Sequence, residues 1–180
     1  SNICVSTDSI KIKKIAENSG LSVPFLRPRH LSTDTASSDD VILHALEYYN
    51  KNFDAVVLLQ PTSPLRQSVH IIEALDLYSN KLDMVVSVYE SDANPYSNLY
   101  IENKSGYINK ILENKFTRRQ DCPKVWRVNG AIYIINPDSI REKKINQFKY
   151  VKKYVMDKNS SVDIDYKYDL DLVKFLLKKR

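Results

Sequence analysis

Glycine, cysteine and long apolar runs are scarce in this chain of 180 residues. The three glycines, Gly20, Gly106 and Gly130, do not stand in a glycine-rich loop. The two cysteines, Cys4 and Cys122, have neither CxxC nor Cys/His spacing, which argues against a structural zinc site or a disulfide scaffold. No apolar run approaches the ~18 residues of a membrane span, and the amino terminus lacks a signal-peptide pattern. We therefore expect a soluble, cytoplasmic protein without membrane association.

Positive charge exceeds negative charge only modestly. The formal net charge is +5 and the pI is about 9.0, and much of the excess lies in Lys143/Lys144, Lys152/Lys153 and the terminal Lys178-Lys179-Arg180. Such groups are typical of solvated faces and tails. Because no aromatic stacking platform or known nucleic-acid module accompanies them, we expect no nucleic-acid partner. An anionic small substrate would account for the remaining excess.

Apolar segments and helical patterns alternate along the chain. With 43% hydrophobic residues, the length suits one domain, residues 1–180. Continuous apolar runs predict strands, and apolar residues at helical spacing, ended by Gly20 or begun by the caps at Ser37–Asp40, predict helices. The alternation predicts an α/β fold with an open, mostly parallel sheet, in which ligands gather beyond the carboxyl ends of the strands. The predicted strands are Ile3–Val5, "DAVVLLQ", "DMVVSVY", "GAIYIIN" and "KYVMD"; the later helices are about Ser68–Ser79 and Tyr168–Leu177.

The pattern changes over residues 91–128. This stretch is polar, aromatic and hairpin-like, with Gly106 as a turn signal. We interpret it as an insertion on the sheet, serving as a dimerisation arm or a substrate-binding flap.

Two acidic residues, Asp163 and Asp165, stand one residue apart in "SVDID". On an extended strand their side chains would share one face, with the carboxylates about 6 to 7 Å apart. Two such carboxylates can hold one Mg²⁺, which typically takes one or two protein carboxylates together with phosphate oxygens. A solvated strand face is the alternative reading of this spacing.

Three further segments place polar groups near the predicted ligand-binding edge. In "QPTSPLR", prolines pin the loop, and the amide of Gln60 can match the edge of a pyrimidine. Arg27 precedes a proline, while Ser37 and Ser38 stand at a helix N-terminus, which attracts anionic or carbonyl groups although capping alone would explain a serine there. In "TRRQDCP", the guanidinium groups of Arg118 and Arg119 each suit a carboxylate.

Taken together, "VSTDS", "FLRP…TDTASS", "LLQPTSPLR", "FTRRQ", "NGAIYI" and "SVDID" resemble the acylneuraminate cytidylyltransferases, or CMP-sialic acid synthetases. Their order and spacing match from residue 3 to the final helix. The resemblance implies a Rossmann-like fold of the nucleotidyltransferase type and an enzyme that joins CTP to a nine-carbon 2-keto sugar acid, releasing pyrophosphate. It also implies a homodimer in which the arm of one subunit helps to close the partner's site.

The resemblance assigns roles by motif position. Arg27, Ser37, Ser38 and Gln60 fall where the family holds cytosine and ribose. Asp163 and Asp165 fall on its catalytic metal aspartates, which implies Mg²⁺ as the cofactor. The sugar-acid side of the pocket would be formed by Arg119, Asn129 and Tyr133.

Two departures from the family pattern qualify these expectations. The family begins with a strand and a glycine- and basic-rich triphosphate loop of the sort "ARGGSKG", whereas this sequence starts at the second strand, as an N-terminally truncated domain would. A catalytically silent fragment or dimerisation partner of the same fold is therefore the alternative hypothesis. The chain also has Asn94-Pro95-Tyr96-Ser97 where sialic acid enzymes often carry a lysine. Legionaminic or pseudaminic acid thus remains open as the sugar.

Overall fold

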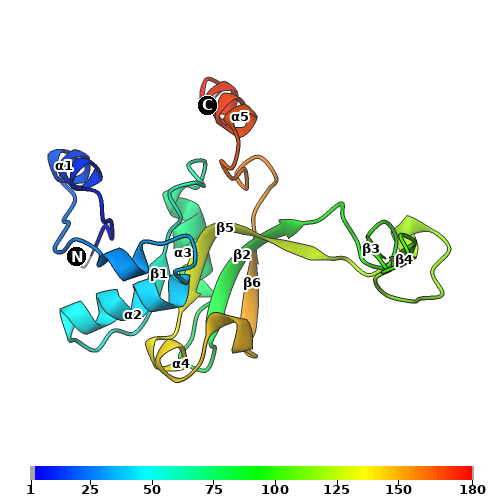
Figure 1. Cartoon of the computed structure of the whole chain (residues 1–180), viewed down its shortest axis with the longest axis horizontal. Coiled ribbons are helices and arrows are strands. Elements are labelled where there is room, and N and C mark those ends of the chain that lie inside the picture. Colours follow the sequence, from blue (N-terminus) through cyan, green and yellow to red (C-terminus); the bar gives the residue numbers. More distant parts are fainter. Residues whose placement is uncertain (1–2, 180) are drawn as a thin grey trace. The chain divides into compact units, whose positions relative to one another are not determined.

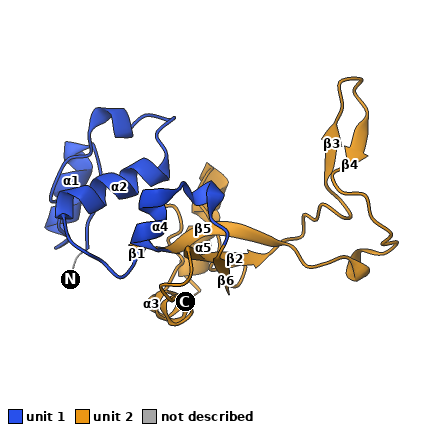
Figure 2. Cartoon of the chain, turned by 90° about the horizontal axis from the view of Figure 1, so that it is seen from below, with its two compact units in different colours: residues 1–56, 135–149 blue, residues 57–134, 150–180 orange. Residues whose placement is uncertain are grey.

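The computed structural model describes residues 3–179 and divides the chain into two units (Figure 2). The first unit runs to Val56 and includes Ile135–Lys149. The second comprises Val57–Ile134 and the chain from Tyr150 onward, so residues 91–128 lie wholly within it. Within the described residues, no helix is both long and apolar enough to cross a bilayer.

A four-stranded sheet carries most of the fold, in the order β1-β5-β2-β6. The strands span Val56–Leu58 (β1), Met84–Glu90 (β2), Trp126–Ile135 (β5) and Val151–Val155 (β6). β2 and β6 are parallel, with Met84 opposite Val151 and Val88 opposite Val155. The chain leaves β2, passes through residues 91–125 and returns along β5, so β5 runs against β2 (Figure 1). The α/β class is confirmed, and the sheet is mixed.

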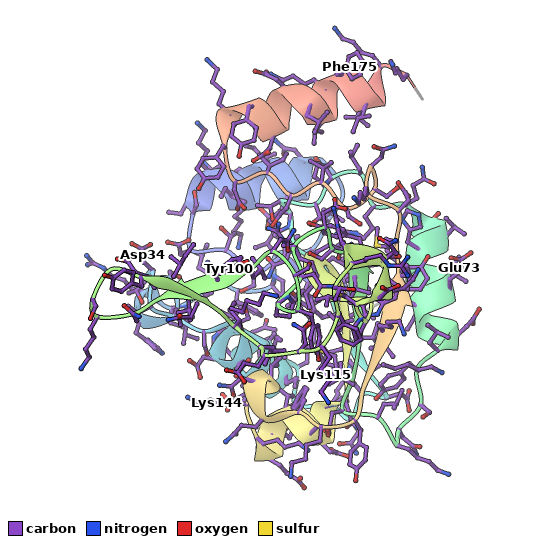
Figure 3. The ribbon with its side chains drawn as sticks, turned by 90° about the vertical axis from the view of Figure 1, so that its right-hand side faces the viewer. Asp34, Glu73, Tyr100, Lys115, Lys144 and Phe175 are labelled. Carbon is purple, nitrogen blue, oxygen red and sulfur yellow. The ribbon has the colours of Figure 1, made fainter. Side chains whose placement is uncertain are left out.

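The buried centre of the sheet follows from the apolar runs. β2 has the sequence MVVSVYE, and its first five residues are buried, as expected for a strand covered on both faces. Ile132 and Ile134 of β5 are fully buried beside it. On β6, Tyr154 donates a 2.5 Å hydrogen bond to Glu73 of α3 (Ser68–Asp76). Figure 3 labels Glu73. Burial and the hydrogen bond to Glu73 raise the pKa of Tyr154.

β1 departs from the expectation of a strand buried on both faces. It stands at one edge of the sheet and is three residues long; Val57 within it and Leu59 just after it are each 37% exposed. An edge strand has a neighbour on one side only, so a run that is apolar enough for the sheet interior stays partly uncovered here.

The first unit is mainly helical. α1 (Ile10–Asn18) begins at Ser9, whose side chain accepts from Ile12 N, and the chain turns away at Gly20, as predicted. α2 spans Ser38–Tyr49 and packs with α4, Pro137–Glu142; two short 3₁₀ turns, Arg29–Leu31 and Ile145–Gln147, complete the unit. The predicted strand Ile3–Val5 is not formed. This extended segment instead bonds through Val5 N to Ser22 O, 3.2 Å, without a ladder.

The predicted hairpin within residues 91–128 is present. β3 (Tyr100–Glu102) and β4 (Ile108–Lys110) form a separate antiparallel pair around Gly106, and a 3₁₀ turn follows at Arg119–Asp121. Every residue of the two strands is exposed, including the large apolar Ile101 and Ile108. An isolated two-stranded hairpin is marginally stable in water, so this surface favours coverage by another element.

Candidate functional site

A cleft of about 610 Å³ opens in the second unit. Its walls come from β5, from the loop after β6 and from the start of α5 (Lys167–Leu177). Four of the residues proposed from the sequence line it together: Asn129, Tyr133, Asp163 and Asp165.

The "SVDID" segment reaches this cleft as a loop, and the prediction of a strand there is wrong. It carries no strand hydrogen bonding, but Ile164 N donates to Thr62 O at 2.9 Å. That single bond joins the segment to the "QPTSPLR" loop without a ladder. Asp163 is half-buried whereas Asp165 is exposed, so the two carboxylates occupy different environments.

Gly130 of β5 lies beside Asp163 in a left-handed backbone conformation. Its φ is +74°, and a Cβ built there would lie 3.6 Å from Asp163 Oδ2 and 3.8 Å from Ser63 Oγ. Those distances are ordinary van der Waals contacts, so space alone would admit a Cβ, but any other residue would need a strained left-handed backbone conformation. The positive φ therefore explains why a glycine stands in "NGAIYI" in this fold.

Asn129, next to Gly130, is buried and fully hydrogen-bonded within the protein. Its Oδ1 accepts from Ser87 Oγ at 2.5 Å and from Ala131 N at 3.1 Å. Its Nδ2 donates to Ser161 Oγ at 2.8 Å and to Met156 Sδ at 3.4 Å. An amide makes about four such bonds. Direct binding of the sugar acid by this side chain would therefore require one of them to break.

The residues present fit a divalent cation at Asp163. Its Oδ1 is buried and has no hydrogen-bond partner among the described residues. A buried charged oxygen without a partner is costly, and a bound ion would satisfy it. Across residues 3–179, no group of three or more His, Cys, Asp or Glu could hold a metal ion. Two carboxylates completed by substrate phosphate oxygens suit Mg²⁺.

Tyr133 keeps its proton in this setting. Burial raises the pKa of its phenol, and the negative charge of Asp163 raises this pKa further. The hydroxyl is therefore neutral near pH 7 and can donate a hydrogen bond into the cleft.

Several charged residues that line the cleft were not singled out from the sequence, among them Arg127, Lys158 and Asp169. Arg127 precedes "NG" on β5 and lies over the ring of Tyr89, 6.0 Å from its centroid. Asp169 accepts from the backbone N of Asp165, 3.1 Å, and of Tyr166, 2.8 Å, at the start of α5. The acid in the first turn of a predicted helix was a capping signal that could have located Asp169.

Arg119 lies in a second hollow of about 600 Å³. Its Nη2 contacts Asp92 Oδ1 at 3.1 Å and Asp92 O at 3.2 Å, whereas its neighbour Arg118 makes a two-pronged pair with Asp121, at 2.8 and 3.0 Å. Of the two arginines, Arg119 is thus the one that faces a hollow. Asp92 and Lys158 line both this hollow and the cleft of Asp163.

The "QPTSPLR" loop is hydrogen-bonded to β5, which forms one wall of the cleft. Ser63 is fully buried, and its hydroxyl donates to Asn129 O at 3.5 Å. Arg66 donates to Ala131 O at 2.7 Å and to Gln60 O at 3.2 Å, and burial lowers the pKa of its guanidinium. Gln60 is half-buried at the end of the β1 segment, and its role with the nucleotide stays a prediction.

The remaining predicted residues, Arg27, Ser37 and Ser38, belong to the first unit. Arg27 donates from Nε to Ser32 Oγ at 3.1 Å and lies 3.9 Å from Asp8 Oδ1. Ser37 caps α2 and accepts from Asp40 N at 3.2 Å, and Ser38 is the first residue of that helix. Capping thus accounts for Ser37 structurally, and the binding roles of all three stay predictions.

Comparison with known families decides the assignment. A family model described as "Cytidylyltransferase" matches residues 1–179. This chain belongs to the cytidylyltransferase family.

Curated relatives agree with this assignment. The chain is 38% identical to the N-acylneuraminate cytidylyltransferase of Escherichia coli, covering 99% of the chain and 42% of that protein. It is 35% identical to the post-translational flagellin modification protein B of Campylobacter coli, covering 99% and 78%, respectively. A CMP-N,N'-diacetyllegionaminic acid synthase of Campylobacter jejuni is 32% identical, over 98% of the chain and 77% of the synthase.

The fold also matches a solved structure. A CMP:2-keto-3-deoxy-manno-octonic acid synthetase in complex with CTP superposes with a TM-score of 0.69 and 13% identity, covering 99% of this chain and 81% of the other. At this identity the match supports the fold, and it confirms the Rossmann-like, nucleotidyltransferase-type architecture.

We predict that Asn129→Ala lowers the free energy of unfolding by about 2 to 4 kcal/mol, because its buried partners Ser87 and Ser161 lose hydrogen bonds. Urea denaturation measures the loss. Asn159→Ala, at an exposed amide in the loop after β6, is the control and should change stability by less than about 0.5 kcal/mol. Equal stability of the two variants would contradict a structural role for Asn129.

Proposed function

We propose that this protein transfers CMP from CTP to the anomeric hydroxyl of a nonulosonic acid and releases pyrophosphate. The observation that carries the proposal is the half-buried Asp163, with one unpartnered carboxylate oxygen, in a cleft with Asp165 and Tyr133. Membership of the cytidylyltransferase family supplies the reaction class.

In this reaction the sugar hydroxyl attacks the α-phosphorus of CTP, the new O–P bond forms, and the bond to pyrophosphate breaks in line. The hydroxyl proton is lost to solvent or a nearby base. Such transfers depend mainly on positioning and on stabilising the charge of the phosphoryl group. A covalent intermediate on the protein is not required.

Asp163 and Asp165 would hold Mg²⁺ in the proposed site. When bound, Mg²⁺ supplies charge stabilisation and orientation to the phosphate groups. The protein's part is to keep the carboxylates in place: Thr62 O accepts a hydrogen bond from Ile164 N, between the two acids.

The other predicted residues are assigned to the two substrates. We propose that Arg27, Ser37, Ser38 and Gln60 contact cytosine and ribose, and that Arg119 and Tyr133 serve the sugar acid. Tyr133 suits the sugar side because its phenol lines the cleft with Asp163 and can donate a hydrogen bond there. Asn129 would act there chiefly by shaping the wall of the cleft, since its own amide is already hydrogen-bonded.

We propose the chemical class of the sugar acid, and several acids of that class are candidates. The relatives named above include enzymes for an acylneuraminate and for N,N'-diacetyllegionaminic acid. Sialic acid enzymes often carry a lysine shortly after the position of Asn94-Pro95, whereas this chain continues with Tyr96-Ser97. The Asn94 side chain donates to Pro123 O at 2.9 Å. We therefore propose a nonulosonic acid, with legionaminic and pseudaminic acids as candidates beside N-acetylneuraminate, and cytoplasm as the place of synthesis.

A homodimer would explain the exposed apolar hairpin. Tyr100, Ile101, Tyr107 and Ile108 all expose large apolar side chains on or beside β3 and β4. Exposed apolar patches of this kind mark interaction surfaces. We propose that a second copy of the chain covers this surface.

The test of the function uses protein expressed from its complete reading frame, with CTP, Mg²⁺ and each of the three nonulosonic acids. We expect pyrophosphate release with at least one acid and formation of the matching CMP-sugar, detected by ³¹P NMR. Absence of turnover with every acid would favour the catalytically silent alternative.

A second prediction concerns the acidic pair. Asp163→Asn should reduce kcat at least ~10³-fold, because the carboxylate that would hold Mg²⁺ is lost. Stability should change by less than about 1 kcal/mol, since the unpartnered Oδ1 already disfavours the folded state. Mn²⁺ binding in the presence of CTP, followed by electron paramagnetic resonance, gives a readout independent of turnover. Asp171→Asn on α5, an exposed acid, is the control.

A third prediction concerns assembly. Ile101→Lys combined with Ile108→Lys should shift the protein from dimer to monomer, because two charges would have to be buried in the apolar contact. Sedimentation velocity measures the change. Ile72→Lys, on the exposed face of α3, should leave the dimer intact. A double variant that sediments as wild type does would place the interface elsewhere.

A further inference from the structure

The ion pair between Asp92 and Lys158 borders both hollows of the second unit. Asp92 and Lys158 line the cleft that contains Asp163 and Asp165, and they also line the hollow that contains Arg119. Lys158 comes from the loop after β6, five positions before Asp163, whereas Asp92 follows β2. A charged group at this boundary can reach a ligand that occupies both spaces.

Asp92 holds two cations at once. Its Oδ2 accepts from Lys158 Nζ in a short hydrogen bond, and its Oδ1 accepts from Arg119 Nη2 at 3.1 Å. These two partners hold the pKa of the Asp92 carboxyl below its usual value. The arrangement places one carboxylate between an ammonium and a guanidinium.

These contacts are exposed and hence exchangeable. The side chains of Asp92, Lys158 and Arg119 are 71%, 58% and 61% exposed, respectively. Exposed ion pairs contribute little stability because water competes for both partners. A ligand carboxylate has the same charge, geometry and hydrogen-bonding capacity as Asp92, so it can take the same cations at small cost.

We propose that Lys158 is a further substrate-binding residue, and that Asp92 occupies, in the free protein, the position of the sugar acid's carboxylate. On binding, the ligand carboxylate replaces Asp92 as the partner of Lys158 and Arg119. This inference rests on the proposed function, because it names the group of the acceptor that the boundary between the hollows recognises. It makes Asp92 an internal competitor of the substrate.

The position of Lys158 agrees with this role. The acceptor's anomeric carbon carries both the carboxylate and the attacking hydroxyl in a 2-keto acid. A cation that borders the Asp163 cleft can therefore hold the carboxylate while the hydroxyl points toward the phosphate side. Arg119 alone, in the second hollow, borders only one of the two spaces.

The test compares three variants in steady-state kinetics, using the nonulosonic acid that gives the highest wild-type rate. Lys158→Met should raise KM for the acid about tenfold or more, with KM for CTP within twofold, because a charge-assisted bond to the acid is lost. Asp92→Asn should lower KM for the acid about two- to fivefold, because the competing charge is removed. The methyl ester of the acid, which lacks the charge, should lose most of its dependence on Lys158.

Lys174→Met is the matched control. Lys174 on α5 pairs with Asp171 at 3.6 Å, has comparable exposure and lines neither the Arg119 hollow nor the Asp163 cleft. Its substitution should change both KM values less than twofold.

Three results would overturn the inference: an unchanged KM for the acid in Lys158→Met, a rise confined to KM for CTP, or an unchanged or raised KM for the acid in Asp92→Asn. The second result would place Lys158 on the phosphates. An inactive wild type would instead refute the proposed function, so the two failures are distinguishable.

Discussion

The hydrogen bonds of the Asn129 amide are the constraint on which the candidate site depends. They join three parts of the chain that are distant in sequence: β2 through Ser87, β5 through Ala131, and the loop after β6 through Ser161. Each of these partners is a polar group that would be costly to leave unpaired inside the protein. The amide thus sets where the "SVDID" loop starts relative to the sheet. Asp163, two residues beyond Ser161, takes its position from that start.

Around this buried network the site divides into a fixed part and an adaptable part. The Asn129–Ser161 hydrogen bond and the backbone bond between Ile164 and Thr62 restrain the loop that carries Asp163. Arg119, Lys158 and Asp92 lie at the surface and make exposed ion pairs. Phosphoryl transfer requires charges that are already positioned, which suits the fixed part. Exposed ion pairs suit recognition of an anionic acceptor, because they can break and form again with a ligand while the fold stays intact.

Four of the residues proposed from the sequence line one cleft, but the local structure expected for two of them was wrong. The spacing of Asp163 and Asp165 predicted a shared strand face, but a loop places one acid half-buried and the other exposed. The segment forms no strand because its single backbone bond goes to the "QPTSPLR" loop, and no pattern in "SVDID" reveals that partner. Ser37 was predicted as a cap from local sequence, and it is one, since capping depends on the next few residues alone. Lys158 carried no local signal, because its relevance comes from two hollows formed by distant segments.

The sequence by itself determined the family, the α/β class, most helices and the apolar strands, because periodicity, capping residues and motif order are local properties of the chain. Only the tertiary structure decided that Asn129 is an internal tie, that β1 is an edge strand and that Asp92 holds two cations. These properties depend on which distant segments meet across the sheet and its loops. Hydrogen bonds and ion pairs form between groups that folding brings together, and their partners are not encoded in the spacing along the chain.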